Sequence, residues 1–350
     1  MVTMVGVDVH KRTHTAVAVD AVGRQLGTRT VRATDAGHRQ LLGWVLREYG
    51  SEVEFAVEDC RHVSTRLERA LLGAGQVVLR VPPKLMAGVR TSARTRGKSD
   101  PIDALAIARA ALREPDLPRA EHSEASRELK LLVDHREDLV RMRTQMQNRL
   151  RWHLHELDPE LDLPDRGLDR FVVLDRVEAR LAELPASMVA RLAGELTDDI
   201  RALTRRVNAL EREITALVRQ RAPRLLELPG CGALTAAKIV GETAHPTRFR
   251  SEACFAMHAG VAPIPASSGK TDRHRLARGG NRQLNAALHR IAVTQIRLDG
   301  PGRVYYQHRR SNGDTTMEAL RALKRRLARI VFTPLDPITT TESACLTAAA

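Results

Sequence analysis

Asp8 is the first residue whose type asks for a chemical explanation, because aspartate disfavours strands and this one interrupts an alternating run of valines. Val5, Val7 and Val9 recur at every second position, which predicts a strand with these valines on its core face. Asp8 and His10 then point to the opposite face. A lone carboxylate at that place is better explained as a solvated surface group, so the other acidic residues decide whether Asp8 has a chemical role.

Three more carboxylates stand at the ends of predicted elements. Glu58 ends the strand predicted over Val53–Val57, and Asp59 beside it is an alternative for the same position. Asp100 and Asp103 are spaced i, i+3, which places both on one face of a helix. Together with the aspartate of the first strand, they can converge at one end of a sheet.

Four carboxylates packed together repel one another, and each raises the pKa of its neighbours unless cations neutralise them. Hard oxygen ligands suit Mg²⁺, which binds few carboxylates and keeps sites for water and phosphate oxygens. Two such ions can stabilise the attacking and leaving oxygens of a phosphoryl transfer. The acidic set therefore predicts nuclease-like chemistry with Mg²⁺ as cofactor.

The elements that must position these carboxylates form a predicted α/β domain over the first 112 residues. Three strands come first, and a helix–strand–helix–strand–helix order follows. That order is typical of an RNase H-like sheet. The predicted strands are Val5–Val9, Thr15–Val19, Thr28–Val31, Val53–Val57 and Val77–Val81, and the predicted helices include 35–48 and Val63–Leu72.

A helical arm is predicted over 113–223. Residues 121–157 form a charged helix with heptad-like apolar spacing, and a proline-punctuated stretch separates it from a second helix. The apolar positions of that second helix step 3, 4, 3, 4, 3 through Ile200, Leu203, Val207, Leu210, Ile214 and Leu217. The pattern predicts a coiled-coil arm used for oligomerisation or as a spacer. A helical hairpin within one chain explains it equally well.

Positive charge is concentrated in one part of the chain. Lys and Arg total 56 against 42 Asp and Glu, and residues 246–335 contain 17 of the basic side chains but only 5 of the acidic ones. A general bias toward arginine would spread along the chain, so this excess indicates a polyanion-binding surface. Aromatic residues make up only 3%, and phosphate contacts are therefore expected rather than stacking on bases.

Residues 224–335 are predicted to be mostly helical and to begin with a helix–hairpin–helix. Gly230 and Gly232 follow a Leu-Pro pair and precede an Ala-rich helix. The glycines allow backbone N–H groups to approach a phosphate at a helix start, where the dipole favours an anion. A plain packing corner between two helices fits the same residues.

A predicted loop at Ser267-Ser268-Gly269-Lys270 lies among arginines. A serine hydroxyl is a weak nucleophile, and it needs a metal, a base or positive charge to attack phosphate. The residues alone therefore favour a phosphate-binding loop over a catalytic serine. The side chains expected to contact nucleic acid here are Lys270, Arg273, Arg275, Arg278 and Arg282.

Several segments resemble the DEDD transposases of the insertion sequence 110 family, whose N-terminal domain resembles RuvC-type Holliday-junction resolvases. Three segments of this chain look like the acidic motifs of that family: VGVDVHKRTHTAVAVD, FAVEDCRH and RGKSDPIDALAIARAAL. A fourth segment looks like the C-terminal domain of the same family: FAMHAGVAPIPASSGKTDRHRLARGGNRQLNAALHRIA. The resemblance covers about 1–112 and 224–332 in the family's motif order, and it ends soon after Phe332.

The resemblance implies site residues and their roles. The catalytic tetrad, which would also hold Mg²⁺, is Asp8, Glu58, Asp100 and Asp103. Lys98 fits the family's K-[ST]-D pattern and would contact phosphate. The serine before the glycine attacks DNA in that family and forms a covalent phosphoserine link. By position this is Ser268, with Ser267 as the alternative.

The function implied is a transposase of a bacterial insertion sequence that excises and inserts its own DNA. A structured RNA from the element would pair with donor and target DNA, and the protein would act as a dimer or tetramer. The enzyme alternative is a RuvC-type junction-resolving endonuclease without covalent serine chemistry. The non-enzymatic alternative is a helix–hairpin–helix nucleic-acid-binding or scaffold protein with an inert tetrad.

Two exclusions complete the interpretation. No stretch approaches the roughly 20 apolar residues of a membrane span, and the start MVTMVGVDVHKR lacks a signal-peptide layout. The four cysteines, Cys60, Cys231, Cys254 and Cys345, include no CxxC pair, which argues against a disulfide framework and a structural zinc site. A cytoplasmic, nucleoid-associated bacterial protein is expected. Its expected parts are a RuvC-like DEDD domain (1–112), a linker and arm (113–223), a C-terminal transposase domain (224–335) and a disordered tail (336–350).

Overall fold

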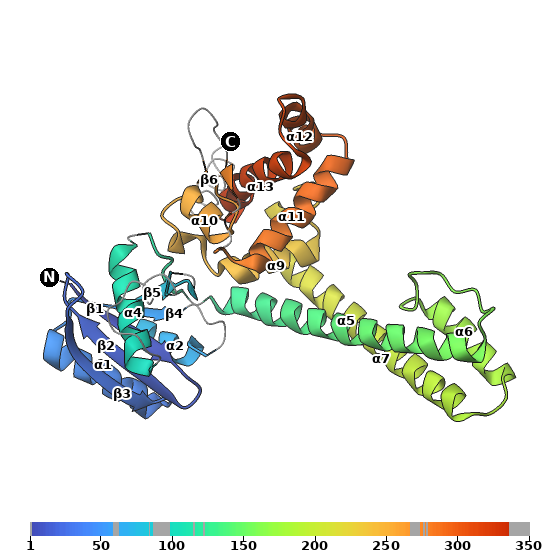
Figure 1. Ribbon diagram of the computed structural model, residues 1–350, viewed down its shortest axis with the longest axis horizontal. Coiled ribbons are helices and arrows are strands. Elements are labelled where there is room, and N and C mark those ends of the chain that lie inside the picture. The colour runs from blue at the N-terminus through green and yellow to red at the C-terminus, as the bar shows by residue number, and fades with distance from the viewer. Residues whose placement is uncertain are drawn as a thin grey trace, which may run out of the picture. The chain divides into compact units, whose positions relative to one another are not determined.

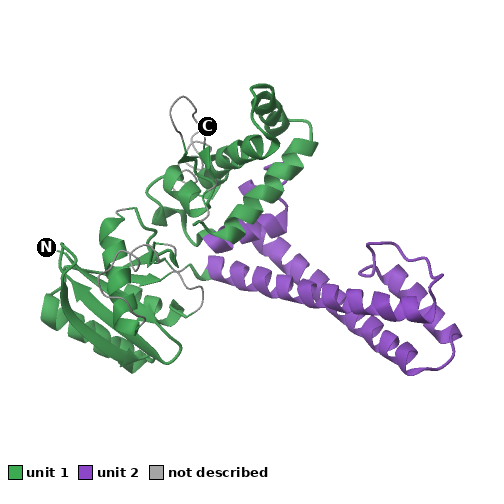
Figure 2. Cartoon of the chain, viewed as in Figure 1, with its two compact units in different colours: residues 1–124, 243–350 green, residues 125–242 purple. Residues whose placement is uncertain are grey.

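The computed structural model describes most of the chain. The described residues are 2–58, 63–83, 85–86, 99–114, 116–121, 123–266, 274–275, 277 and 279–335. The predicted disordered tail, 336–350, therefore lies outside the described residues. The chain divides into two compact units, residues 1–124 with 243–350 and residues 125–242 (Figure 2).

A five-stranded mixed sheet forms the N-terminal part of the first unit (Figure 1). Its strands are β1 (Thr3–Val9), β2 (Thr13–Val19), β3 (Gln25–Arg32), β4 (Val53–Glu58) and β5 (Val77–Val81), in the order β3-β2-β1-β4-β5. β1 pairs antiparallel with β2 and parallel with β4, which places the first strand in the centre of the sheet. All five predicted strands are confirmed, with bounds that differ by a few residues.

Helices cover both faces of this sheet. The valines of β1 pack with α1 (Asp35–Tyr49) and α2 (Thr65–Gly73) in one core cluster. Met4 and Ala56 pack on the other face with α4 (Asp100–Arg113). Gly6 permits this second contact, because a Cβ there would overlap the backbone of Ala104 and Ala108. The face of β1 that carries Asp8 is therefore covered by a helix.

The second unit is helical. It consists of α5 (Glu124–Leu157), α6 (Phe171–Glu183), α7 (Met188–Arg221), α8 (Pro223–Leu226) and most of α9 (Ala233–Thr243). Arg136 on α5 bonds Glu211 on α7, while Arg143, further along α5, bonds Thr204, which lies earlier on α7. The two long helices are therefore antiparallel partners within one chain, which is the hairpin alternative of the sequence interpretation (Figure 1).

The apolar seam of this hairpin follows most of the predicted heptad. Ile200, Leu203 and Val207 are buried, and the last two share a cluster with Leu139 of α5. Near the end of α7 the buried position is Val218 rather than the predicted Leu217. The seam shifts by one residue there because a straight helix drifts relative to a strict seven-residue repeat.

The C-terminal part of the first unit is mostly helical, as predicted. It contains α10 (Glu252–His258), α11 (Arg282–Arg297), α12 (Pro301–Ser311) and α13 (Thr316–Phe332), the short strands β6 (Ile264–Pro265) and β7 (His274–Arg275), and the 3-10 turns η1 (Pro246–Arg248) and η2 (Thr333–Leu335). Phe249, Phe255 and Phe332 form an aromatic cluster between η1, α10 and the end of α13. Buried leucines of α11 and α13 complete the core.

Candidate active site

The acidic site begins at the end of the central strand. Asp8 is only 5% exposed, and it stands opposite Thr15 of β2 in the antiparallel register. In the parallel register of β1 with β4, Val7 stands opposite Val57. The next residues along these strands are Asp8 and Glu58, so the sheet places two of the predicted tetrad side by side at the same strand ends.

The first turn of α4 brings two more carboxylates to this end of the sheet. The helix begins at Asp100 with a proline in its first turn, and the N-cap Ser99 makes no side-chain capping bond. Asp100 and Asp103 therefore stand where the positive end of the helix dipole favours negative charge. Asp103 is buried and Asp100 is half-exposed, so the pair leads from the interior to the surface.

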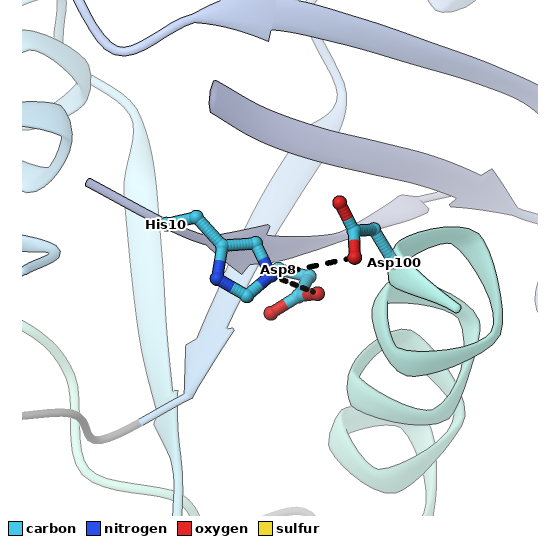
Figure 3. A group of neighbouring side chains, drawn as sticks. All are labelled: Asp8, His10 and Asp100. Atoms are coloured by element: carbon cyan, nitrogen blue, oxygen red, sulfur yellow. Dashed lines mark hydrogen bonds and ion pairs between the residues drawn. The ribbon is translucent and has the colours of Figure 1, made fainter. Parts of the chain in front are cut away.

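His10 joins this group, although the sequence interpretation did not assign it a role. Its Nε2 lies 3.1 Å from Oδ2 of Asp8 and 3.5 Å from Oδ1 of Asp100 (Figure 3). The signal in the sequence was the i, i+2 spacing from Asp8, which puts both side chains on one face of a strand. A protonated His10 would bridge the two carboxylates.

The environment of Asp8 disfavours its charged form. Burial raises the pKa of Asp8, and the nearby carboxylates of Asp103 and Asp100 raise it further. His10 acts in the opposite direction, through its charge and its hydrogen bond. A cation at this place would relieve the repulsion among the three aspartates.

Asp8, His10 and Asp100 could together hold a metal ion. Each offers one ligand atom, and these atoms lie within 4.8 Å of one another. The two carboxylates provide the hard oxygen ligands that suit Mg²⁺, whereas imidazole is the usual partner of softer metals. The donor set thus fits a divalent cation held by carboxylates, with His10 as a hydrogen-bonding neighbour.

Several predicted site residues lie outside the described residues. They are Lys98, Ser268 with its alternative Ser267, Lys270, Arg273 and Arg278, and also Asp59, the alternative to Glu58. The described strands β6 and β7 flank the serine segment in the chain. Among the remaining predicted nucleic-acid contacts, Arg275 lies on β7 and Arg282 begins α11, and both side chains are exposed.

The two glycines of the predicted hairpin differ in their backbone. The turn between α8 and α9 contains both, and Gly230 has φ = 85°, a conformation that glycine adopts readily. Gly232 has open space around its Cα and no positive φ. Only Gly230 is therefore required by the turn. Cys231 between them is a buried free thiol, and burial raises its pKa to about 12.

Comparisons with known proteins agree with this geometry. Residues 5–159 match a family model for the DEDD transposases of insertion sequence IS110, and residues 222–307 match the model described as "Transposase IS116/IS110/IS902 family". Together the two models cover more than two thirds of the chain and include the acidic site. The chain belongs to this family of transposases. It is therefore an enzyme that transfers phosphoryl groups of DNA.

Similar proteins come from bacterial insertion elements. The 44.8 kDa protein of element IS116 of Streptomyces clavuligerus is 29% identical, and the match covers 96% of this chain and 98% of that protein. The 43.6 kDa protein of element IS110 of Streptomyces coelicolor is 28% identical, with 97% and 95% covered. The 42 kDa protein of element IS900 of Mycobacterium paratuberculosis is 27% identical, with 97% and 98% covered.

One solved structure is similar to the transposase over a third of its length. It is the RuvC protein of T. thermophilus in complex with a Holliday junction substrate, which matches 34% of this chain and 100% of its own, at 15% identity and a TM-score of 0.28. Within the described residues, no helix of the transposase combines the length and apolar character of a membrane span.

Proposed function

We propose that this transposase excises and inserts the DNA of a bacterial insertion sequence through a RuvC-type acidic site and a covalent serine–DNA intermediate. The observation that carries the acidic half is the convergence of Asp8, Asp100 and Asp103 at the end of β1, where burial and the two helix carboxylates raise the pKa of Asp8. Such crowding is unfavourable for folding and is explained when the site holds cations for phosphoryl transfer.

The proposed tetrad consists of Asp8, Glu58, Asp100 and Asp103. When bound there, Mg²⁺ would neutralise phosphate oxygens and lower the barrier to displacement at phosphorus. The carboxylates would hold the Mg²⁺ at one end of the sheet, while His10 keeps Asp8 oriented through its hydrogen bond. Lys98, next in the chain to the N-cap of α4, is proposed to contact phosphate.

The nucleophile is proposed to be Ser268. Its Oγ forms an ester bond with phosphorus, the bond from phosphorus to the leaving deoxyribose oxygen breaks, and that oxygen receives the proton that the serine loses. Attack by the hydroxyl of another strand reverses these steps and joins the exchanged ends. Because each step exchanges one phosphate ester for another, no external energy source is needed.

The domains and partners proposed follow from this chemistry. A DEDD domain (1–112) carries the tetrad, an arm (113–223) is a spacer between the domains in the chain, and a C-terminal domain (224–335) with a helix–hairpin–helix carries the serine. The protein would act as a dimer or tetramer. The excess of basic residues over 246–335 would bind donor and target DNA together with a guide RNA from the element. The protein would work in the cytoplasm, at the nucleoid.

The second candidate is a junction-resolving endonuclease that uses the same tetrad with water as nucleophile. The described acidic site supports both candidates equally, because both use the same carboxylates. Ser268 discriminates between them, since it is essential in the transposase mechanism and dispensable in the resolvase mechanism.

The acidic site is tested by Asp8→Asn in an assay of Mg²⁺-dependent strand cleavage with purified protein, flanking RNA and DNA spanning the element junction. We expect cleavage to fall by at least about 100-fold, because the central carboxylate is lost. The variant should fold, since it removes a buried charge that repels its neighbours. Asp35→Asn, which changes an exposed carboxylate on α1, is the matched control and should leave cleavage unchanged. Full cleavage by Asp8→Asn would refute the assignment.

A further inference from the structure

A cavity of about 300 Å³ lies in the C-terminal part of the first unit and has no role in the site described above. Residues 260–263 line one side, called its floor here, and residues of α12, α13 and β7 line its walls. A volume of this size is at the lower end of ligand pockets and accommodates a phosphate with part of a sugar.

Among the described residues, five Lys and Arg side chains and two carboxylates line the cavity. Asp314 is bonded to Arg309 at 2.5 Å, and Glu318 accepts the hydrogen bonds of the Thr315 capping box. Arg325 is bonded to Glu252 at 3.1 Å. Arg321 pairs with Glu318 at 3.9 Å. Among the described residues, the lining cations without a carboxylate partner are therefore Lys324 and Arg275, and the full set of lining cations is Arg275, Arg309, Arg321, Lys324 and Arg325.

Lys324 is the unusual member of this group. It is only 7% exposed, yet no carboxylate among the described residues lies within ion-pair distance of its Nζ. Burial lowers the pKa of Lys324, and the nearby Arg321 lowers it further. A buried ammonium beside another cation is unfavourable for the free protein, and an anion in the cavity would compensate that cost.

The rest of the wall holds Lys324 in place. Its Nζ donates to Oδ1 of Asn285 at 2.7 Å, and the Asn285 amide donates in turn to the carbonyl oxygens of Ala259 and Gly260 at 2.9 and 3.0 Å. Gly280 packs so closely on the backbone of Gly260 that it does not accommodate a Cβ, and Gly260 itself has φ = 65°, a conformation that favours glycine. The ammonium is thus positioned by this wall. Among the described residues Asn285 is its one hydrogen-bond partner, which leaves two of its three donors for a ligand.

The cavity is adjacent in the chain to the serine segment. Pro263 on its floor directly precedes β6, and His274 and Arg275 on its wall form β7. Ser268 lies between these two strands in the sequence. We propose that this cavity binds a phosphate group of the DNA strand, with Lys324 and Arg321 as its ligands, and so positions the strand relative to Ser268. The DNA assignment rests on the proposed function of that serine.

The test is Lys324→Gln in the full chain, with the affinity for a DNA oligonucleotide measured as a function of salt. Glutamine keeps a donor for Asn285 but removes the charge. We expect about a ten-fold loss of affinity and a salt dependence reduced by about one phosphate contact. A merely structural effect would not change the salt slope. Arg321→Gln should lower the affinity and the salt dependence in the same direction, and it replaces Lys324→Gln in the test if that variant does not fold.

Arg329→Gln is the matched control, because it removes one charge from an exposed site on the same helix. It should leave the salt slope unchanged, and an equal loss in this control would overturn the proposal in favour of diffuse charge. Two parallel titrations, one with the flanking RNA and one with inorganic phosphate, test whether another ligand occupies the cavity. Loss of affinity for the flanking RNA alone, or Lys324-dependent binding of inorganic phosphate with unchanged DNA affinity, would each overturn it. DNA affinity does not require cleavage, so these outcomes are independent of whether Ser268 forms an adduct.

Discussion

At the scale of single residues, the acidic site is explained by position rather than by residue type. Asp8 is ionisable, buried and surrounded by other carboxylates because β1 is central in the sheet and α4 begins beside its end. His10 is the one described side chain of this group that opposes their repulsion. An isolated surface aspartate would have none of these neighbours, and the interpretation of Asp8 as a solvated group is therefore wrong.

A second titratable pair lies on the other face of the sheet. His14 of β2 and His38 of α1 are both buried, with their Nε2 atoms 3.2 Å apart and their rings stacked at 5.2 Å. Burial and the neighbouring His38 lower the pKa of His14 to about 4, and burial lowers that of His38 as well. Both rings are therefore neutral in the folded protein at pH 7.

This pair makes the stability of the domain depend on pH. Since the pKa of His14 is lower in the folded state than the ordinary 6.5, the unfolded state binds more protons between pH 6.5 and 4. Stability is thus fully present above pH 6.5 and is lost as the pH falls toward 4. Between pH 7 and pH 5 the loss should be about 2 kcal/mol.

The measurement is urea unfolding at pH 7, 6 and 5 for the natural protein and His14→Gln. Glutamine retains hydrogen bonding but does not titrate, so the variant should lose less stability over this range. Equal losses in the two proteins would show that the histidine pair does not titrate on unfolding.

At the scale of elements, the contact of α4 with β1 determines the geometry of the site. Gly6 sits two residues before Asp8, where a Cβ would come within 2.5 Å of the backbone nitrogen of Ala108. The helix can lie close to the strand only because this position has no side chain. Any displacement of α4 moves Asp100 and Asp103 away from Asp8.

Gly6→Ala should therefore lower both stability and cleavage. We expect a loss of about 1–3 kcal/mol in the free energy of unfolding, as for other overpacked positions, and a fall in cleavage at saturating metal. Gly43→Ala is the matched control: the neighbour of its Cβ is the flexible end of Arg47, so the helix α1 should be stabilised by up to about 1 kcal/mol. Thermal unfolding and strand cleavage measure both variants, and unchanged cleavage in Gly6→Ala would contradict this account.

The elements were predicted from sequence where their patterns are local. The strands follow alternating valines and were found within a few residues. The heptad predicted α7 from Ile200 onward, whereas the helix begins earlier, at Met188. α6 was missed, because Phe171–Glu183 is short, lies among prolines and is held by Leu174 and Val177 in a core shared with α7. The one-residue shift from Leu217 to Val218 likewise depends on the partner helix. Tertiary contacts decide both features, and a single sequence does not display them.

At the scale of the whole molecule, charge and family membership agree. The basic excess of residues 246–335 is visible in the composition, and it supports the proposal that this part of the chain binds nucleic acid. The candidate site was predicted in its carboxylates but not in His10, because a hydrogen bond between side chains depends on rotamers. The antiparallel pairing of α5 and α7 within one chain also required the structure.

The most direct test of the central claim is a denaturing gel of purified protein, Mg²⁺, flanking RNA and DNA spanning the element junction. The account predicts a covalent protein–DNA adduct that Ser268→Ala and Asp8→Asn abolish and Ser267→Ala retains. Nicked DNA without an adduct, unaffected by Ser268→Ala but abolished by Asp8→Asn, would contradict the serine mechanism and establish water as the nucleophile.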